Sequence, residues 1–112
     1  MSGTKPILRK WSGRIRTADR KAYVDYVMES GAADYSKTPG NLGFQILTRD
    51  LGDGTTSITT LSWWHSMDAV RQFAGPEPEI ARYYPEDDRF LLERPETVEH
   101  HVVEKGHVQL GL

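Results

Sequence analysis

The sequence contains no cysteine, which excludes disulfide bonds, thiolate nucleophiles and cysteine-ligated zinc or iron–sulfur centres. Long apolar runs are missing as well, since no stretch approaches the roughly 18 residues of a membrane span. Residues 1–10 lack the apolar segment of a secretory signal. We therefore expect a cytoplasmic protein without membrane contact, held together by packing alone.

The length of 112 residues suits one domain with one hydrophobic core. We expect a single domain over residues 1–112, with a flexible segment at 1–5 and a tail at 106–112. Half of the 14 basic residues lie within the first 21 positions, whereas acidic residues gather between positions 77 and 104. With a net charge of −2, we interpret this split as pairing within the fold or between copies, ahead of a nucleic-acid site.

The first regular element predicted is a strand over residues 7–16, in which Ile7, Trp11 and Ile15 fall on one side. Thr17 then offers a side-chain oxygen as a helix N-cap. Apolar residues recur after it at helical spacing, so we expect a helix that ends near Gly31 or, alternatively, extends toward position 35.

Two further strands are predicted to form a hairpin. Residues 42–49 alternate apolar and polar side chains, and residues 51–54 have the Asp-Gly chemistry of a tight turn. The strand that follows, Thr55 to His65, is rich in β-branched and aromatic residues. These two strands should therefore pair antiparallel.

A second helix is predicted after Ser66, which can serve as its N-cap, and Gly75-Pro76 should end it. Residues 77–95 are rich in proline and charge, with a helical turn expected at 79–84. We interpret the acidic run 86–88 as solvated. A final strand is expected at about residues 98–104.

This order, βαββαβ, predicts a ferredoxin-like α+β fold: an antiparallel four-stranded sheet with two helices on one face. The other face is then left uncovered. Leu61 and Trp63 are too apolar to face water there. We therefore predict a homodimer formed through the sheet face.

In this order of elements, in the turn Pro39-Gly40-Asn41 and in the segment 61–69 with its Trp64-x-Ser66 pattern, the chain resembles the antibiotic biosynthesis monooxygenase family. The resemblance implies a dimeric α/β barrel with a pocket for a planar aromatic compound such as a polyphenol, a quinone precursor or haem. Trp64 matches the tryptophan that roofs this pocket. In members that need no cofactor, the substrate itself reduces dioxygen while the protein orients and desolvates it.

The chain departs from the family's patterns at several positions. Polyphenol-oxidising members place an amide four residues before the tryptophan, where this chain has Thr60. Haem-degrading members need an asparagine on the first strand and a histidine on the second helix. The single asparagine, Asn41, lies elsewhere, and no histidine occurs between positions 66 and 99. Haem degradation by that triad is therefore not expected.

The candidate site residues follow from these patterns, each with an alternative. Trp64 stacks on a ligand or fills the core, and His65 acts as a base or lies exposed at the strand end. Arg9 binds a phenolate or carboxylate, or reaches the sheet edge. The expected ligand-binding residues are Trp64, Thr60, Arg9, Trp11 and Tyr83, with Tyr84 as the alternative to Tyr83; the catalytic candidates are Trp64 and His65. No metal or cofactor is expected.

Two functions remain open on this evidence: a monooxygenase-like enzyme for a small aromatic compound, or a non-catalytic binding or sensor homodimer of the same fold. An RNA-recognition module also runs βαββαβ. Its third strand needs a basic residue and a glycine before alternating aromatics, whereas residues 56–64 offer hydroxyl groups and two adjacent tryptophans. RNA binding is therefore disfavoured.

Overall fold

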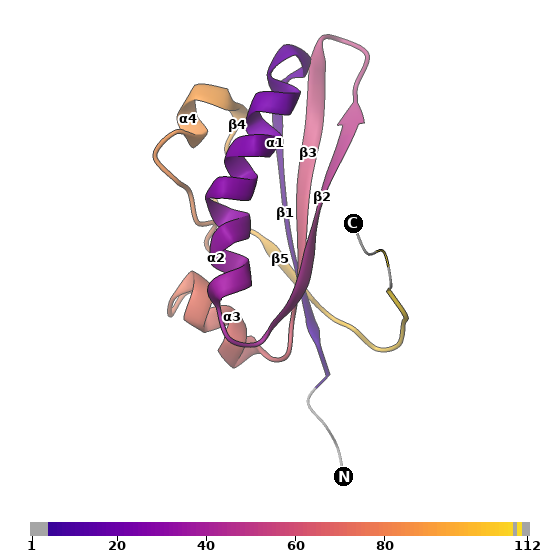
Figure 1. The fold of residues 1–112 in the computed structure, drawn as a ribbon, viewed down its shortest axis with the longest axis vertical. Helices are drawn as coiled ribbons and strands as arrows, with labels where there is room; N and C mark the ends of the chain where they lie inside the picture. The colour runs from indigo at the N-terminus through magenta and orange to yellow at the C-terminus, as the bar shows by residue number, and fades with distance from the viewer. Residues whose placement is uncertain (1–4, 109, 111–112) are drawn as a thin grey trace.

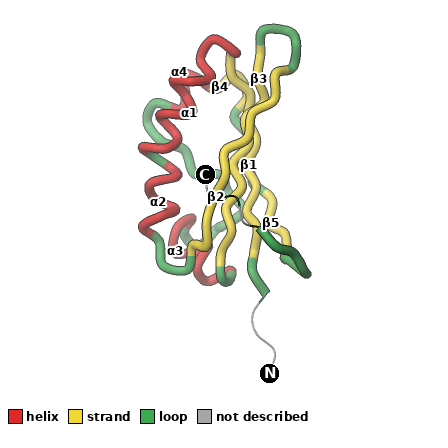
Figure 2. Tube along the Cα trace, turned by 45° about the vertical axis from the view of Figure 1, so that its right-hand side comes forward, coloured by secondary structure: helices red, strands yellow, loops and turns green. Residues whose placement is uncertain are grey.

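The computed structural model describes residues 5–108 and 110, arranged in two layers. Helices cover one face of an antiparallel sheet, and no helix from the described residues lies on the opposite face (Figures 1 and 2). The elements in chain order are β1 (Ile7–Arg16), α1 (Arg20–Glu29), α2 (Gly31–Lys37), β2 (Asn41–Asp50), β3 (Thr55–Trp64), α3 (Met67–Ala74), α4 (Asp87–Phe90), β4 (Leu91–Glu93) and β5 (Glu99–Val102).

The sheet runs in the order β2-β3-β1-β4, and β5 also pairs with β1. Both late strands are antiparallel to β1: β4 pairs near Ile15 and β5 pairs from Ile7 to Lys10. They share the fourth position of the sheet because Pro95 lies between them and cannot donate a ladder hydrogen bond. The predicted ferredoxin-like α+β fold is confirmed, with β4 as a strand that the sequence did not predict.

The start and middle of the first helical segment differ from the prediction. Thr17 does not cap the helix; residues 17–19 form a short 3-10 turn, and the Thr17 hydroxyl lies 2.8 Å from that of Thr56. The segment also divides at Ser30, whose backbone angles (φ −110°, ψ −95°) are not helical. The helix thus continues past Gly31, as the longer alternative had it, but as a separate element, α2.

The second predicted helix is confirmed as α3, and the region after it is not. Ser66 accepts a hydrogen bond from the Ala69 N–H at 3.2 Å, as its N-cap role requires. Residues 79–84 are not helical: Ile80 forms a β-bridge with Thr97, and residues 81–84 form no regular element. The helical turn occurs later, at α4.

Gly40 is required in the turn that joins α2 to β2. Its φ of +88° belongs to the left-handed region that side chains rarely adopt. A Cβ atom at this position would also lie 2.6 Å from the Cβ of Ala69 on α3. The turn therefore packs directly against α3 and fixes the start of β2 beside the end of β3.

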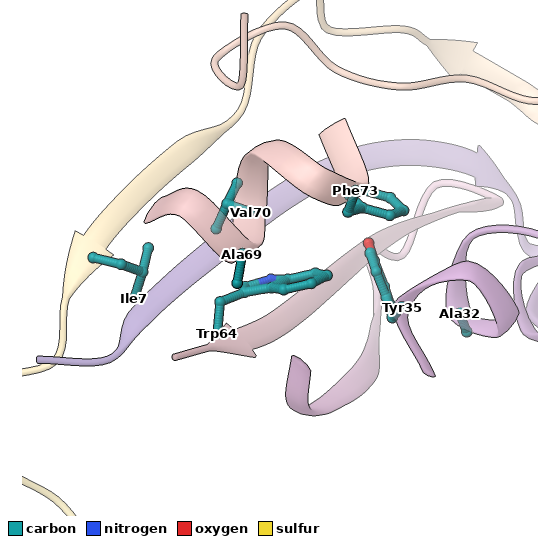
Figure 3. Packing of buried hydrophobic residues seen from close by; sticks show 7 residues of the cluster. All are labelled: Ile7, Ala32, Tyr35, Trp64, Ala69, Val70 and Phe73. Carbon is teal, nitrogen blue, oxygen red and sulfur yellow. The ribbon is translucent and has the colours of Figure 1, made fainter. Parts of the chain in front are cut away.

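Two clusters of buried residues lie between the sheet and the helices. The first surrounds Trp64 beneath α3, as Figure 3 shows. The second lies toward the other end of the sheet, around Tyr23 of α1 and Ile58 of β3. Their buried members are Ile7, Ala32, Tyr35, Trp64, Ala69, Val70 and Phe73 in the first, and Ile15, Tyr23, Val27, Ile58 and Phe90 in the second.

Of the predicted terminal segments, residues 1–4, 109, 111 and 112 lie outside the described residues. None of the helices formed by the described residues is long and apolar enough to cross a membrane.

Candidate ligand-binding site

A cavity of about 50 Å³ lies between the sheet and the helices and opens to the surface on one side. Residues of both core clusters contribute to its walls. The buried part of its lining includes Arg9, Tyr23, Tyr35, Thr60, Phe73 and Asp87, and the more exposed part includes Trp11, Arg82, Tyr83, Tyr84 and Val98.

Arg9 extends from β1 into the wall of this cavity and is only 4% exposed. Its Nη1 donates to the carbonyl oxygen of Pro78 at 2.5 Å, and Nη2 lies 3.4 Å from that of Ile80. The guanidinium also lies 5.7 Å from the centre of the Phe73 ring. Burial lowers the pKa of Arg9, yet a guanidinium stays protonated in proteins.

His100 on β5 is the third partner of Arg9. Its Nε2 lies 3.0 Å from Nη1 of Arg9. Because the arginine can only donate, Nε2 must accept, and the ring must be neutral with its proton on Nδ1. Burial and the charge of Arg9 both lower the pKa of His100, consistent with this neutral form. His101, the next residue, instead pairs with Glu99 on the opposite face.

Trp11 and Tyr83 form one side of the cavity. The Trp11 indole N–H donates to the Tyr83 hydroxyl at 3.1 Å, and the two rings meet edge to face. Tyr83 in turn donates to the carbonyl oxygen of Pro95. Gly13 follows on the same face of β1, and a Cβ there would lie 2.7 Å from the Trp11 ring. The indole is therefore laid across Gly13.

Two pairs of phenol and carboxylate brace the helix side of the cavity. Tyr23 donates to Asp87 at 2.8 Å, and Tyr84 donates to Asp34 at 2.6 Å. Burial raises the pKa of both phenols, and the neighbouring carboxylates raise it further, so both remain neutral at physiological pH. Asp87 is 5% exposed, so the interpretation of residues 86–88 as a solvated run is wrong at this position.

The remaining polar groups of the lining also have partners. The Thr60 and Tyr35 hydroxyls lie 3.3 Å apart. Arg82 pairs with Asp34 at 3.2 Å and donates to the Phe73 carbonyl oxygen at 2.8 Å. The contact between Thr60 and Tyr35 thus joins the sheet to α2, and Arg82 joins α2 to the end of α3.

Trp64 lies outside this lining. Its side chain is fully buried, and its indole N–H donates to Ser62 Oγ at 2.8 Å. In Figure 3 the indole lies beneath α3, with the Tyr35 ring at its far end; the two ring centres are 5.9 Å apart. This position matches the alternative of a core residue, and ligand stacking on Trp64 stays a prediction.

His65 is exposed just after β3 and does not line the cavity, so its role as a base also stays a prediction. The other four expected ligand-binding residues come together around the same cavity: Arg9, Trp11, Thr60 and Tyr83. Tyr84, the alternative to Tyr83, also lines the cavity. Sequence reasoning missed Tyr23, Tyr35, Arg82 and Asp87. Tyr23 and Tyr35 had a signal in the helical spacing, whereas Arg82 and Asp87 depend on contacts between distant segments.

No group of three or more His, Asp or Glu side chains that could hold a metal ion occurs within residues 5–108 and 110. The lining instead combines aromatic rings with two guanidinium groups, an arrangement suited to an organic ligand.

Comparison with known proteins supports the fold and leaves the reaction open. No protein-family model matches the sequence, and no curated protein does. Solved structures do match over nearly the whole chain. A protein from Bacillus cereus assigned to the antibiotic biosynthesis monooxygenases has a TM-score of 0.61 at 12% identity, covering 94% of this chain and 99% of its own. The chain has the fold of the antibiotic biosynthesis monooxygenases.

Two other neighbours with this fold differ in activity. A haem-degrading protein from Mycobacterium tuberculosis has a TM-score of 0.56 at 15% identity, covering 95% of this chain and 99% of its own. SnoaB, a cofactor-independent oxygenase from Streptomyces nogalater, has a TM-score of 0.50 at 16% identity, covering 97% of this chain and 100% of its own. The predicted resemblance is thus confirmed for the fold, and the activity must be argued from the site.

Proposed function

We propose that this protein is a monooxygenase-like protein of the cofactor-independent kind, which binds a small aromatic compound at the cavity beside Trp11. The observation that carries the proposal is the lining itself: aromatic rings around an opening, with a guanidinium in the buried wall. Aromatic and apolar walls with a few fixed polar groups are typical of small-molecule sites. SnoaB, with the same fold, is a cofactor-independent oxygenase.

The lining suits chemistry in which the substrate supplies the electrons. Oxidation of a ring CH₂ to C=O by one O₂ releases one water, and all four electrons come from the substrate. The protein then needs to orient the substrate and exclude water. The one carboxylate in the lining, Asp87, already accepts hydrogen bonds from Tyr23 and from the Tyr84 N–H, so we do not assign it as a base.

A non-catalytic binding or sensor protein is the second candidate. The observation that favours it is that Trp64, the tryptophan matching the family's pocket, is sealed in the core. Binding would then use the same cavity without turnover. Oxygen consumption alone distinguishes the enzyme from the non-catalytic protein.

The test is oxygen uptake with a panel of hydroquinones and anthrones, comparing the parent with Trp11→Phe and Trp64→Phe. We expect Trp11→Phe to reduce uptake, since it removes the hydrogen bond to Tyr83 at the cavity. Trp64→Phe should lower the melting temperature, whereas the rate of oxygen uptake per folded molecule should change little. Binding of these compounds without oxygen uptake would favour the sensor, and neither binding nor uptake would contradict both candidates.

We also propose that the protein is a homodimer formed through the open sheet face. That face carries Leu8, Leu61 and Trp63, all partly exposed, and Leu47, which is 42% exposed. An apolar sheet face of this kind is normally covered. Light scattering should give the mass of a dimer, and Trp63→Lys should yield the monomer. Met28→Lys, on α1, is the matched control and should leave the dimer intact; a monomeric parent would contradict the proposal.

A further inference from the structure

Arg9 holds a positive charge in the cavity wall without an ion pair to any described residue. Burial lowers its pKa, and Glu79 acts on it only as a longer-range attraction that raises the pKa. Its partners are the carbonyl oxygens of Pro78 and Ile80 and the neutral ring of His100. No carboxylate among residues 5–108 and 110 forms an ion pair with it. Charged side chains this deeply buried are normally paired, because an unpaired charge is costly to remove from water.

The other charged groups of the lining are committed elsewhere. Arg82 pairs with Asp34 at 3.2 Å. Asp87 accepts from the Tyr23 hydroxyl at 2.8 Å and from the Tyr84 N–H at 2.6 Å. The lining thus holds two buried charges of opposite sign, Arg9 and Asp87, neither of which forms an ion pair with a described residue.

Arg9 also has hydrogen-bonding capacity to spare. Nη1 uses both of its N–H groups, and Nη2 uses one, at the long distance of 3.4 Å. The Nε–H and the second N–H of Nη2 have no acceptor among the described residues. Nε and Nη2 form one edge of the guanidinium, and such an edge can bind a carboxylate through two parallel hydrogen bonds.

The size of the cavity limits what can reach this edge. About 50 Å³ admits a carboxylate group and not a fused ring system. The partly exposed aromatic side chains Trp11, Tyr83 and Tyr84 stand nearer the opening, where a ring can lie against them.

We propose that the cavity binds an aromatic carboxylate, with its carboxylate held by Arg9 and its ring at the opening against Trp11 and Tyr83. This inference rests on the proposed binding of an aromatic compound at this cavity and adds the charge of that compound. The carboxylate of Asp87 in the same lining would repel a second negative charge, which favours a carboxylate over a phosphate dianion.

The test is isothermal titration calorimetry of the parent with 2-naphthoate and with 2-naphthamide, its neutral counterpart of similar shape. We expect 2-naphthoate to bind at least about tenfold more tightly, as a charge-assisted hydrogen bond predicts. Equal affinities would overturn the inference and leave the proposed function standing. Binding of neither compound would contradict both. Tighter binding of 2-naphthyl phosphate than of 2-naphthoate would overturn the choice of a carboxylate.

Substitutions at Arg9 and at a control arginine show which residue gives the preference for 2-naphthoate. Arg9→Gln should abolish the preference for 2-naphthoate over 2-naphthamide, whereas Arg9→Lys, which keeps the charge without the planar edge, should retain part of it. Arg71→Gln is the matched control, since Arg71 pairs with Asp68 on α3 outside the lining, and it should change the preference by less than about threefold. A preference that survives Arg9→Gln would overturn the assignment. If Arg9→Gln does not fold, the affinities of the parent for 2-naphthoate and 2-naphthamide still test the inference.

Discussion

Trp11 and Trp64 lie on adjacent strands and on the same face of the sheet, but the protein uses them differently. Trp64 is fully buried, and its N–H is satisfied by Ser62 two residues earlier on the same strand. Trp11 is partly exposed at the cavity, and its N–H reaches Tyr83 in the segment after α3. The difference comes from what lies above each ring: α3 closes over Trp64, whereas a non-helical segment borders Trp11. The half of the interior around Trp64 is sealed, and the half around Trp11 opens through the cavity.

Removal of the Trp64 ring should have the largest effect on stability. We expect Trp64→Ala to lower the free energy of unfolding by about 3–5 kcal/mol, because it leaves a large cavity beneath α3. Trp11→Ala, the matched variant in the open half, should cost about 1 kcal/mol. Urea unfolding gives the free energy of unfolding of each variant, and the two losses are then compared. Similar losses would show that the two halves are equally sealed.

The hydroxyl of Ser62 should contribute next. Ser62→Ala leaves the buried indole N–H of Trp64 without its acceptor, so we expect a loss of about 1–3 kcal/mol in urea unfolding. Ser12→Ala is the control, since its hydroxyl pairs with Thr59 on the open sheet face and should cost less. A loss no greater than that of Ser12→Ala would contradict the role assigned to Ser62.

A methyl group at Gly13 should disturb the open half alone. Because its Cβ would lie 2.7 Å from the Trp11 ring, Gly13→Ala should displace the indole and weaken binding of 2-naphthoate. The unfolding free energy should change by only about 1 kcal/mol, since the ring edge can move. Gly106→Ala, where an added Cβ meets no atom within 4 Å, is the control. Unchanged affinity for 2-naphthoate in Gly13→Ala would contradict the site.

The smallest expected effect is on the pH dependence of stability. The pKa of His100 is lowered by burial, by Arg9 and by His101, and raised by Glu79, with the net direction downward from about 6.5. The unfolded chain then binds the proton first. The contribution of His100 to stability should be fully present above about pH 6.5, decline as the pH falls below it, and level off below the folded-state pKa. His100→Gln should flatten this decline in urea unfolding measured between pH 7.5 and 5; an unchanged slope would contradict the contact with Arg9.

The sequence predicted those parts of the fold that depend on local chemistry. The alternation in β1 and β3, the Ser66 cap and the stop at Gly75 are all set by neighbouring residues. It also placed Arg9, Trp11 and Thr60 on one face, because alternation along paired strands decides which side chains meet.

The remaining features depend on contacts between distant segments. Residues 79–84 are not helical because Ile80 pairs with Thr97, and that pairing brings Arg82 and Tyr84 to the cavity. Asp87 is buried because Tyr23 of α1 donates to it. Neither contact leaves a local pattern, so the sequence predicted a helical turn at 79–84 and a solvated run at 86–88 instead.

The most direct test of the account is a crystal structure of the protein with bound 2-naphthoate. We predict carboxylate oxygens about 2.7–2.9 Å from Nε and Nη2 of Arg9, the naphthalene ring against Trp11 and Tyr83, and Trp64 still buried beneath α3. A naphthoate stacked on Trp64, or bound on the open sheet face beside Trp63, would contradict it.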